Sequence, residues 1–153
     1  MKLRFLTIVV LTCAVVGAAT AAIVEPMYLS NRSLGGADLN QYTSGVVGGV
    51  GPNNIGLLVK TSGKVTWVDT TAKYFYVDDG SGLSDGTTRT DNNNLVLGVR
   101  VSYGGLASGV PDIIPPSEND YAVVTGIISV VTISGQIRPN LRVRGGSDIQ
   151  TFH

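Results

Sequence analysis

The chain has 153 residues, of which 43% are hydrophobic and 14% charged, and its 11 basic and 11 acidic side chains balance. This length suits one domain, and the apolar content is sufficient for a packed core, which excludes an intrinsically disordered chain. The single cysteine is Cys13, so a disulfide framework within the chain is excluded as well.

Residues 1–21 have the pattern of a cleaved secretory signal peptide. Two basic residues precede an apolar or small run over residues 5–19, and Ala19-Thr-Ala21 fits the small-x-small cleavage pattern. A membrane anchor needs about 20 apolar residues, which is longer than this run. A lipoprotein is disfavoured because Cys13 lies early and lacks a small residue before it. We therefore expect a secreted, periplasmic or cell-surface protein with no membrane association after cleavage.

The composition after cleavage argues against two classes of function. Nine basic and 11 acidic residues remain, giving a net charge of −2, whereas a general polyanion binder usually has a basic excess. The only histidine is the terminal His153, and no cysteine remains. Side chains for nucleophilic or acid–base catalysis are therefore scarce, and we expect that the protein is not an enzyme.

Residues 22–54 form a segment with six glycines. Glycine is costly to order, so we interpret this segment as an extended N-terminal arm. It also carries apolar side chains such as Tyr28 and Leu34, and we expect part of it to be ordered against a barrel, its own or a neighbour's. Asn31-Arg32-Ser33 matches the acceptor pattern for N-glycosylation. The signal peptide looks bacterial, so we give this match little weight.

From residue 55 onward strand signals dominate: apolar and polar side chains alternate over residues 57–67, 97–101 and 140–144 as in half-buried strands, and residues 121–133 are nearly all β-branched or apolar. Strands are predicted near residues 57–67, 74–78, 97–101, 121–133 and 141–143. Trp67 shares the parity of Val65 and is predicted to be buried. Three prolines exclude a long helix in residues 104–119, and no amphipathic helix follows the signal. Five strands without helices are typical of a small barrel or sandwich.

Five motifs occur in an order that resembles OB-fold domains of exported bacterial proteins, both small periplasmic proteins and modules of large secreted ones. The motifs are Gly63-Lys-Val65, Phe75-Tyr-Val-Asp-Asp-Gly-Ser-Gly82, Gly98-Val-Arg-Val101, Asp120-Tyr-Ala-Val-Val-Thr-Gly126, and Leu141-Arg-Val-Arg144 with Asp148-Ile149. The resemblance covers residues 55–150 and implies an all-β, five-stranded Greek-key barrel with little or no helix. Where such domains often have Gly-Asp, this chain has Asn119-Asp120, and asparagine also tolerates a left-handed turn.

The resemblance implies a shared outer face for one group of candidate ligand-binding residues. These are Tyr74, Tyr76, Arg100, Arg142 and Arg144. Aromatic and arginine side chains together hold single-stranded nucleic acid or stack on sugar rings. Pairing between strands of an exposed sheet face is the alternative explanation.

A second group of candidates is acidic and would bind a cation. Asp78, Asp79, Asp85 and Asp91 lie close together in sequence, and their oxygens suit calcium. Their spacing does not match the EF-hand pattern, and aspartate and glycine are usual in hairpin turns, so a solvated turn is the alternative. No other cofactor is expected.

These features together predict a secreted, non-enzymatic binding module for an oligosaccharide or a single-stranded nucleic acid. OB-folds also bind proteins and ions, so the resemblance leaves the ligand open. The alternative is a structural or assembly protein that self-associates when its N-terminal arm docks on a neighbouring barrel, because an exposed sheet edge accepts an added strand.

Overall fold

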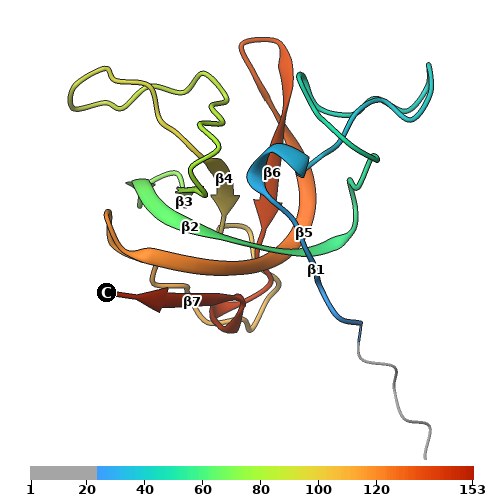
Figure 1. Ribbon diagram of the computed structural model, residues 1–153. Helices are drawn as coiled ribbons and strands as arrows, with labels where there is room; N and C mark the ends of the chain where they lie inside the picture. Colours follow the sequence, from blue (N-terminus) through green and yellow to red (C-terminus); the bar gives the residue numbers. More distant parts are fainter. Residues whose placement is uncertain (1–23) are drawn as a thin grey trace, which may run out of the picture.

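The computed structural model describes residues 24–153, so the predicted signal peptide lies outside the described residues. The described chain is all-β, as expected, and its strands form one mixed sheet (Figure 1). The strands are β1 (Met27–Tyr28), β2 (Leu58–Asp69), β3 (Tyr74–Asp78), β4 (Val99–Ser102), β5 (Tyr121–Ile133), β6 (Gln136–Arg142) and β7 (Ile149–Phe152), with two 3-10 turns at Asn31–Ser33 and Gly146–Asp148. Over this range, no helix has the length and apolar character needed to cross a membrane.

Strands β2 to β6 form a closed ring of hydrogen-bonded neighbours. β2 pairs antiparallel with β3 and β5, β3 with β4, and β5 with β6, whereas β4 and β6 run parallel. β5 is long and curved in Figure 1, and its first half pairs with β2 while its second half pairs with β6. β1 adds to β2 and β7 adds to β5, so segments near both ends of the described chain lie against the ring.

The hydrophobic core lies inside this ring and contains side chains from every ring strand. Its fully buried members include Val59, Val65, Phe75, Val101 and Leu141. Burying a side chain of this size contributes about 1.5–3 kcal/mol. Burial alternates from residue to residue along the first part of β5, although its sequence carries apolar side chains on both faces.

Trp67 is not part of the core, so the prediction for this residue is wrong. The pairing of β2 with β3 shifts register between Val65 and Trp67. An additional residue at such a bulge exchanges the two faces of a strand, and Val68 packs against the core instead. Trp67 is half-buried on the other face, where its ring lies 4.6 Å from the guanidinium carbon of Arg89.

The described part of the N-terminal arm, residues 24–54, packs on this chain's own ring. Leu34 is fully buried within the core cluster, and Leu29 packs against the same cluster. The glycine-rich part folds on itself so closely that a Cβ atom at Gly36 or Gly49 would lie 2.1 Å from a carbonyl oxygen. Part of the arm is therefore ordered against the strands of the same chain. Of the two arrangements expected, docking on its own strands or on a neighbour's, the structure has the first.

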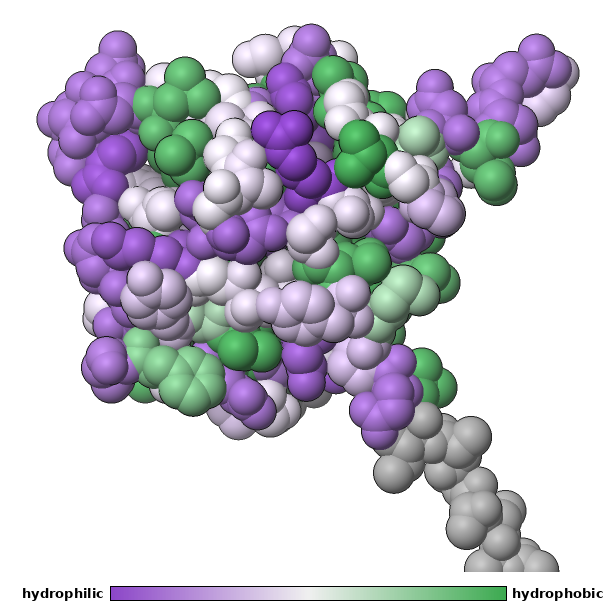
Figure 2. Space-filling view, viewed as in Figure 1, coloured by the Kyte–Doolittle hydropathy of each residue, from purple (hydrophilic) through white to green (hydrophobic). Residues whose placement is uncertain are grey.

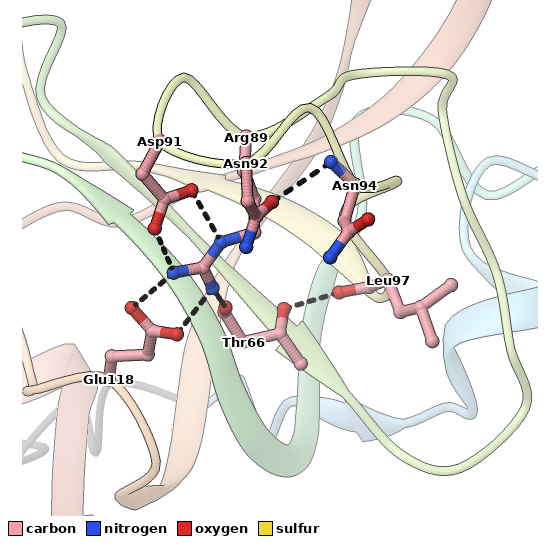
Figure 3. A network of polar contacts seen from close by, with 7 residues as sticks. All are labelled: Thr66, Arg89, Asp91, Asn92, Asn94, Leu97 and Glu118. Carbon is pink, nitrogen blue, oxygen red and sulfur yellow. Dashed lines mark hydrogen bonds and ion pairs between the residues drawn. The ribbon is translucent and has the colours of Figure 1, made fainter.

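A long loop between β3 and β4 folds back over the outer face of the sheet and is held there by Arg89 (Figure 3). The Arg89 guanidinium donates to the Thr66 carbonyl at 3.0 Å and pairs with Asp91 at 2.9 Å and with Glu118. The Thr66 hydroxyl also donates to the carbonyl of Leu97. These contacts attach the loop to β2 at one end and to the segment before β5 at the other.

Candidate functional site

A groove of about 610 Å³ opens on the outer face of the sheet. Its lining residues come from β1, β2, the end of β3 and the turn after it, β5 and β7. They are Tyr28, Ser62, Gly63, Lys64, Asp78, Asp79, Gly80, Tyr121, Ala122, Val123 and Phe152. The groove therefore combines residues from the arm, the ring and the last strand.

The strand register places four of these side chains in one row across the sheet. Asp78 pairs with Lys64, Lys64 with Tyr121, and Tyr121 with Phe152, on β3, β2, β5 and β7 respectively. Neighbouring strands lie about 4.8 Å apart, so the row is roughly 14 Å long. Directly opposed side chains have Cβ atoms about 4.5–5.5 Å apart, which brings Tyr121 and Phe152 side by side on one face.

Three aromatic side chains of the groove are exposed to solvent. Tyr28 is 61% exposed, Tyr121 60% and Phe152 54%. In the space-filling view, apolar surface lies over β7 among polar residues (Figure 2). Concave sites that combine aromatic side chains with a few polar groups are the usual form of a ligand-binding site.

Tyr28 reaches the groove because the arm pairs with β2. Tyr28 is the parallel partner of Lys60, and its hydroxyl hydrogen-bonds to the Ser62 hydroxyl. The next residue, Leu29, donates its amide to the carbonyl of Lys60 at 2.9 Å. The ring of Tyr28 therefore lies beside β2 as one side of the groove.

Asn31 follows Tyr28 and is completely buried. Its backbone amide donates to the Asp79 carboxylate at 2.7 Å, and its side-chain amide donates to the Val77 carbonyl at 2.6 Å. The Thr61 hydroxyl donates to the Asn31 side-chain oxygen at 2.9 Å. A glycan cannot be attached to this side chain in the folded chain. Asn31 instead packs inside the fold, where its side chain makes hydrogen bonds to β2 and β3.

The charges of the groove carry no positive excess. Lys64 lies between Tyr121 and Asp78 in the row, and Asp79 lies at the same end. Partial burial opposes ionisation of Asp79, but hydrogen bonds from Ser81 and from the backbone of Asn31 outweigh it and lower its pKa. Asp79 is thus a carboxylate near neutral pH, and the lining holds two carboxylates for one ammonium group.

The structure brings together three of the five residues expected to form a ligand-binding face, because the rings of Tyr74 and Tyr76 pack edge to face with their centroids 5.8 Å apart, and Arg100 lies over Tyr74. The Arg100 guanidinium stacks on the ring of Tyr74, 3.7 Å from its centroid. Arg142 lies further along β6 and donates to the carbonyl of Gly104 at 3.3 Å. Arg144 lies beyond the end of β6 and forms an ion pair with Asp148 at 2.7 Å.

Tyr76, the fifth residue, is fully buried, so its expected exposure on the outer face is wrong. Its hydroxyl donates to the Asp85 carboxylate at 2.6 Å and lies 3.0 Å from the hydroxyl of Thr87. Burial, followed by the hydrogen bond to Asp85, raises the pKa of Tyr76 far above its ordinary value. The loop after β3 covers this part of the face, because both partners of Tyr76 belong to that loop.

The four aspartates considered as cation ligands have separate partners. The Asp78 carboxylate accepts the Gly80 amide, Asp85 accepts Tyr76, and Asp91 pairs with Arg89, while Asp79 binds the arm. Within residues 24–153, no three histidine, cysteine, aspartate or glutamate side chains gather as metal ligands. The aspartates thus stabilise turns and contacts between segments.

Sequence patterns missed the aromatic residues of the groove for different reasons. Tyr121 lies on the outward parity of β5, but this strand carries apolar side chains on both parities, so the sequence did not mark it as exposed. Tyr28 and Phe152 lie in strands of two and four residues, which are too short to show a period.

The lining sets what the groove can do chemically. It offers aromatic faces for stacking, carboxylates and a hydroxyl for hydrogen bonds, and one ammonium group, and its lining includes neither histidine nor cysteine. These groups suit binding better than proton transfer or nucleophilic attack. Comparison with known proteins adds no relative: the chain matches no protein-family model, no curated protein and no solved structure.

Proposed function

We propose that this chain is an exported, non-enzymatic binding module that holds an oligosaccharide in the groove bordered by Tyr28, Tyr121 and Phe152. The supporting observation is the set of three exposed aromatic side chains around a groove that also holds carboxylates and an ammonium group. An aromatic face receives the apolar face of a sugar ring, and the polar groups bind its hydroxyls.

The charge of the groove favours a sugar over a single-stranded nucleic acid. A nucleic-acid channel combines aromatic residues with a positively charged path for the phosphates. Here Lys64 stands against Asp78 and Asp79, and the chain after the predicted cleavage has a net charge of −2. A ligand with phosphates along its backbone would be repelled, whereas a neutral oligosaccharide would not.

We also propose that the ring is a five-stranded OB-fold barrel of Greek-key type. The support is its neighbour order β2-β3-β4-β6-β5 with closure of β5 on β2, in which only β4 and β6 are parallel. This order agrees with the order of motifs over residues 55–150 and with their resemblance to exported OB-fold domains. A crystal structure would test the closure of β5 on β2.

The sheet edges favour self-assembly as a second candidate function. β1 and β7 end the strand order, and an unpaired edge accepts a strand from another chain. Exchange of the arm between copies would be a domain swap, since residues 24–54 pack on their own ring. Light scattering on the chain with and without residues 24–50 tests this, with each measured mass divided by the mass of one copy. An oligomer that becomes a monomer on deletion supports assembly, and a monomer in both cases excludes it.

Calorimetric titration of the protein starting at residue 22 tests the groove directly. The ligands are cellotetraose and chitotetraose as neutral oligosaccharides, with a short oligothymidine as the nucleic-acid comparison. We expect one of the sugars to bind, and both Tyr121→Ala and Phe152→Ala to weaken it about tenfold, equal to about 1.4 kcal/mol each. Tyr42→Ala is the control, because Tyr42 is an exposed aromatic residue outside the groove.

Two results would contradict the proposal. Unchanged sugar affinity in both groove variants would remove this groove as the site. Tighter binding of oligothymidine than of either sugar, weakened steeply by salt, would assign the chain to single-stranded nucleic acid instead.

A further inference from the structure

We infer that the N-terminal arm is an integral part of the binding groove and that Asn31 is the residue that positions it. The inference rests on the proposed function, because it concerns how one side of the same groove is built. Asn31 acts through Tyr28 and is not among the residues that line the groove.

Tyr28 has little that holds it in place by itself. Strand β1 consists of two residues, and the Tyr28 side chain is largely exposed. Its direct attachments are the hydrogen bond to Ser62 and the short pairing with β2. A strand of only two residues frays readily, so the position of Tyr28 depends on the residues that follow it.

Asn31 supplies the fixed point, because its bonds reach three separate parts of the ring. They end on the Thr61 side chain of β2, the Val77 backbone of β3 and the Asp79 carboxylate after β3. The bonds to Thr61 and Val77 are buried, where hydrogen bonds are strong and a missing partner is costly, whereas the bond to Asp79 is part-buried. The side-chain amide suits both partners, because its nitrogen donates to the Val77 carbonyl while its oxygen accepts from the Thr61 hydroxyl.

The short chain between Asn31 and Tyr28 carries this constraint to the groove. Three residues of chain span at most about 10 Å, so fixing Asn31 confines Tyr28 to the region beside β2. Leu34 adds a second attachment on the far side of Asn31, because it is buried in the core. The arm is thus held at Asn31 and Leu34, and Tyr28 is directed to the groove from there.

Asp79 links this attachment to the acidic end of the groove. Its carboxylate accepts the Asn31 amide at 2.7 Å and the Ser81 amide at 3.0 Å, and the residue also lines the groove. The arm therefore orders the turn that presents Asp78 and Asp79. Undocking of the arm would disturb the groove at the Tyr28 side and at the acidic end together.

Amide hydrogen exchange tests the positioning without any ligand. The Leu29 amide reports arm docking, because it donates to the Lys60 carbonyl. We expect this amide to exchange roughly tenfold faster in Asn31→Ala, while amides in the centre of β5 keep their protection. Thr61→Val is a milder variant should Asn31→Ala fail to fold, and Thr61→Ser, which keeps the hydroxyl, should exchange like the unaltered protein.

A double-mutant cycle tests whether Asn31 acts on binding through Tyr28. The probe is whichever of cellotetraose and chitotetraose binds the unaltered protein more tightly. Tyr28→Ala and Asn31→Ala should each lower affinity about tenfold, and the double variant should lose clearly less than the roughly hundredfold that independent effects would give. Asn92→Ala, in an exposed loop, is the matched control and should change nothing.

The possible failures of the two ideas are distinguishable. Unchanged exchange at Leu29 in Asn31→Ala, or additive losses of affinity in the double variant, would overturn the positioning role of Asn31. Absence of binding by both sugars would refute a groove for these neutral oligosaccharides, and with it the claim that Tyr28 binds them, while the exchange result would still decide whether Asn31 holds the arm.

Discussion

Replacement of Tyr76 by phenylalanine tests whether the loop after β3 closes the face on which this residue was expected to bind ligand. Phenylalanine keeps the buried ring and its packing, so the substitution removes only the hydroxyl group. That hydroxyl donates to the Asp85 carboxylate at 2.6 Å. Asp85 is itself buried, so water cannot readily replace the lost donor, and the carboxylate keeps only the backbone amide of Thr87 among these contacts.

The expected loss of stability follows from this burial. A hydrogen bond to a charged group contributes about 1.5–3 kcal/mol, and we expect the free energy of unfolding to fall by about 2 kcal/mol. For a domain of this size, that corresponds to a decrease in Tm of roughly 8 °C. Urea unfolding, followed by the fluorescence of Trp67, measures the change.

Tyr42→Phe is the matched control, because it removes the same hydroxyl from an almost fully exposed ring. It should leave the urea midpoint unchanged. Sugar affinity should be the same in Tyr76→Phe as in the unaltered protein, since Tyr76 does not line the groove. An unaltered midpoint in Tyr76→Phe would refute the buried hydrogen bond, and weakened sugar binding at full stability would return Tyr76 to the ligand-binding residues.

Three further substitutions test the arm, the loop and the acidic turn. Leu34→Ala should lower the free energy of unfolding by about 2–5 kcal/mol in chemical denaturation, because Leu34 is fully buried in the core; a loss well below this would place the arm outside the core. Arg89→Ala should shift the emission of Trp67 toward that of a solvated tryptophan and make the loop after β3 sensitive to protease, and an unmoved spectrum would count against the stacking. The pKa of Asp79 is lowered in the folded chain, so its ionised form stabilises the fold above the ordinary value of 3.8, and this contribution is lost as pH falls through the lowered pKa. Urea midpoints measured against pH should therefore lose part of their acid dependence in Asp79→Asn, and profiles that run parallel would contradict the role of this carboxylate.

Most of the ring strands were predictable, because their hydrophobic alternation reflects one buried and one exposed face. The predicted bounds of β3 and β5 agree with the structure. Asn119 has the left-handed backbone, with φ of 78°, that its place before Asp120 indicated. The alternation failed at Trp67, because a bulge changes the parity of a strand and leaves no mark in the pattern of side chains.

The groove was not predictable, because its parts are joined only by tertiary structure. Tyr28 and Phe152 lie near opposite ends of the chain and meet through the additions of β1 and β7 to the ring. The burial of Tyr76 was hidden for a similar reason. The loop that covers it is rich in Gly, Asp and Asn and has no apolar period, so nothing in the sequence indicated that it packs on the sheet.

The closure of β5 on β2 has a consequence for the rate of folding. Leu58 pairs with Ile127, so the ring closes only after a long stretch of intervening chain has been brought into place. Domains dominated by such distant pairings fold in milliseconds to seconds, whereas helical bundles fold in microseconds to milliseconds. During that time the edges of β2 and β5 remain unpaired and open to other chains. We therefore expect refolding at high protein concentration to be limited by aggregation, with yields that improve on dilution.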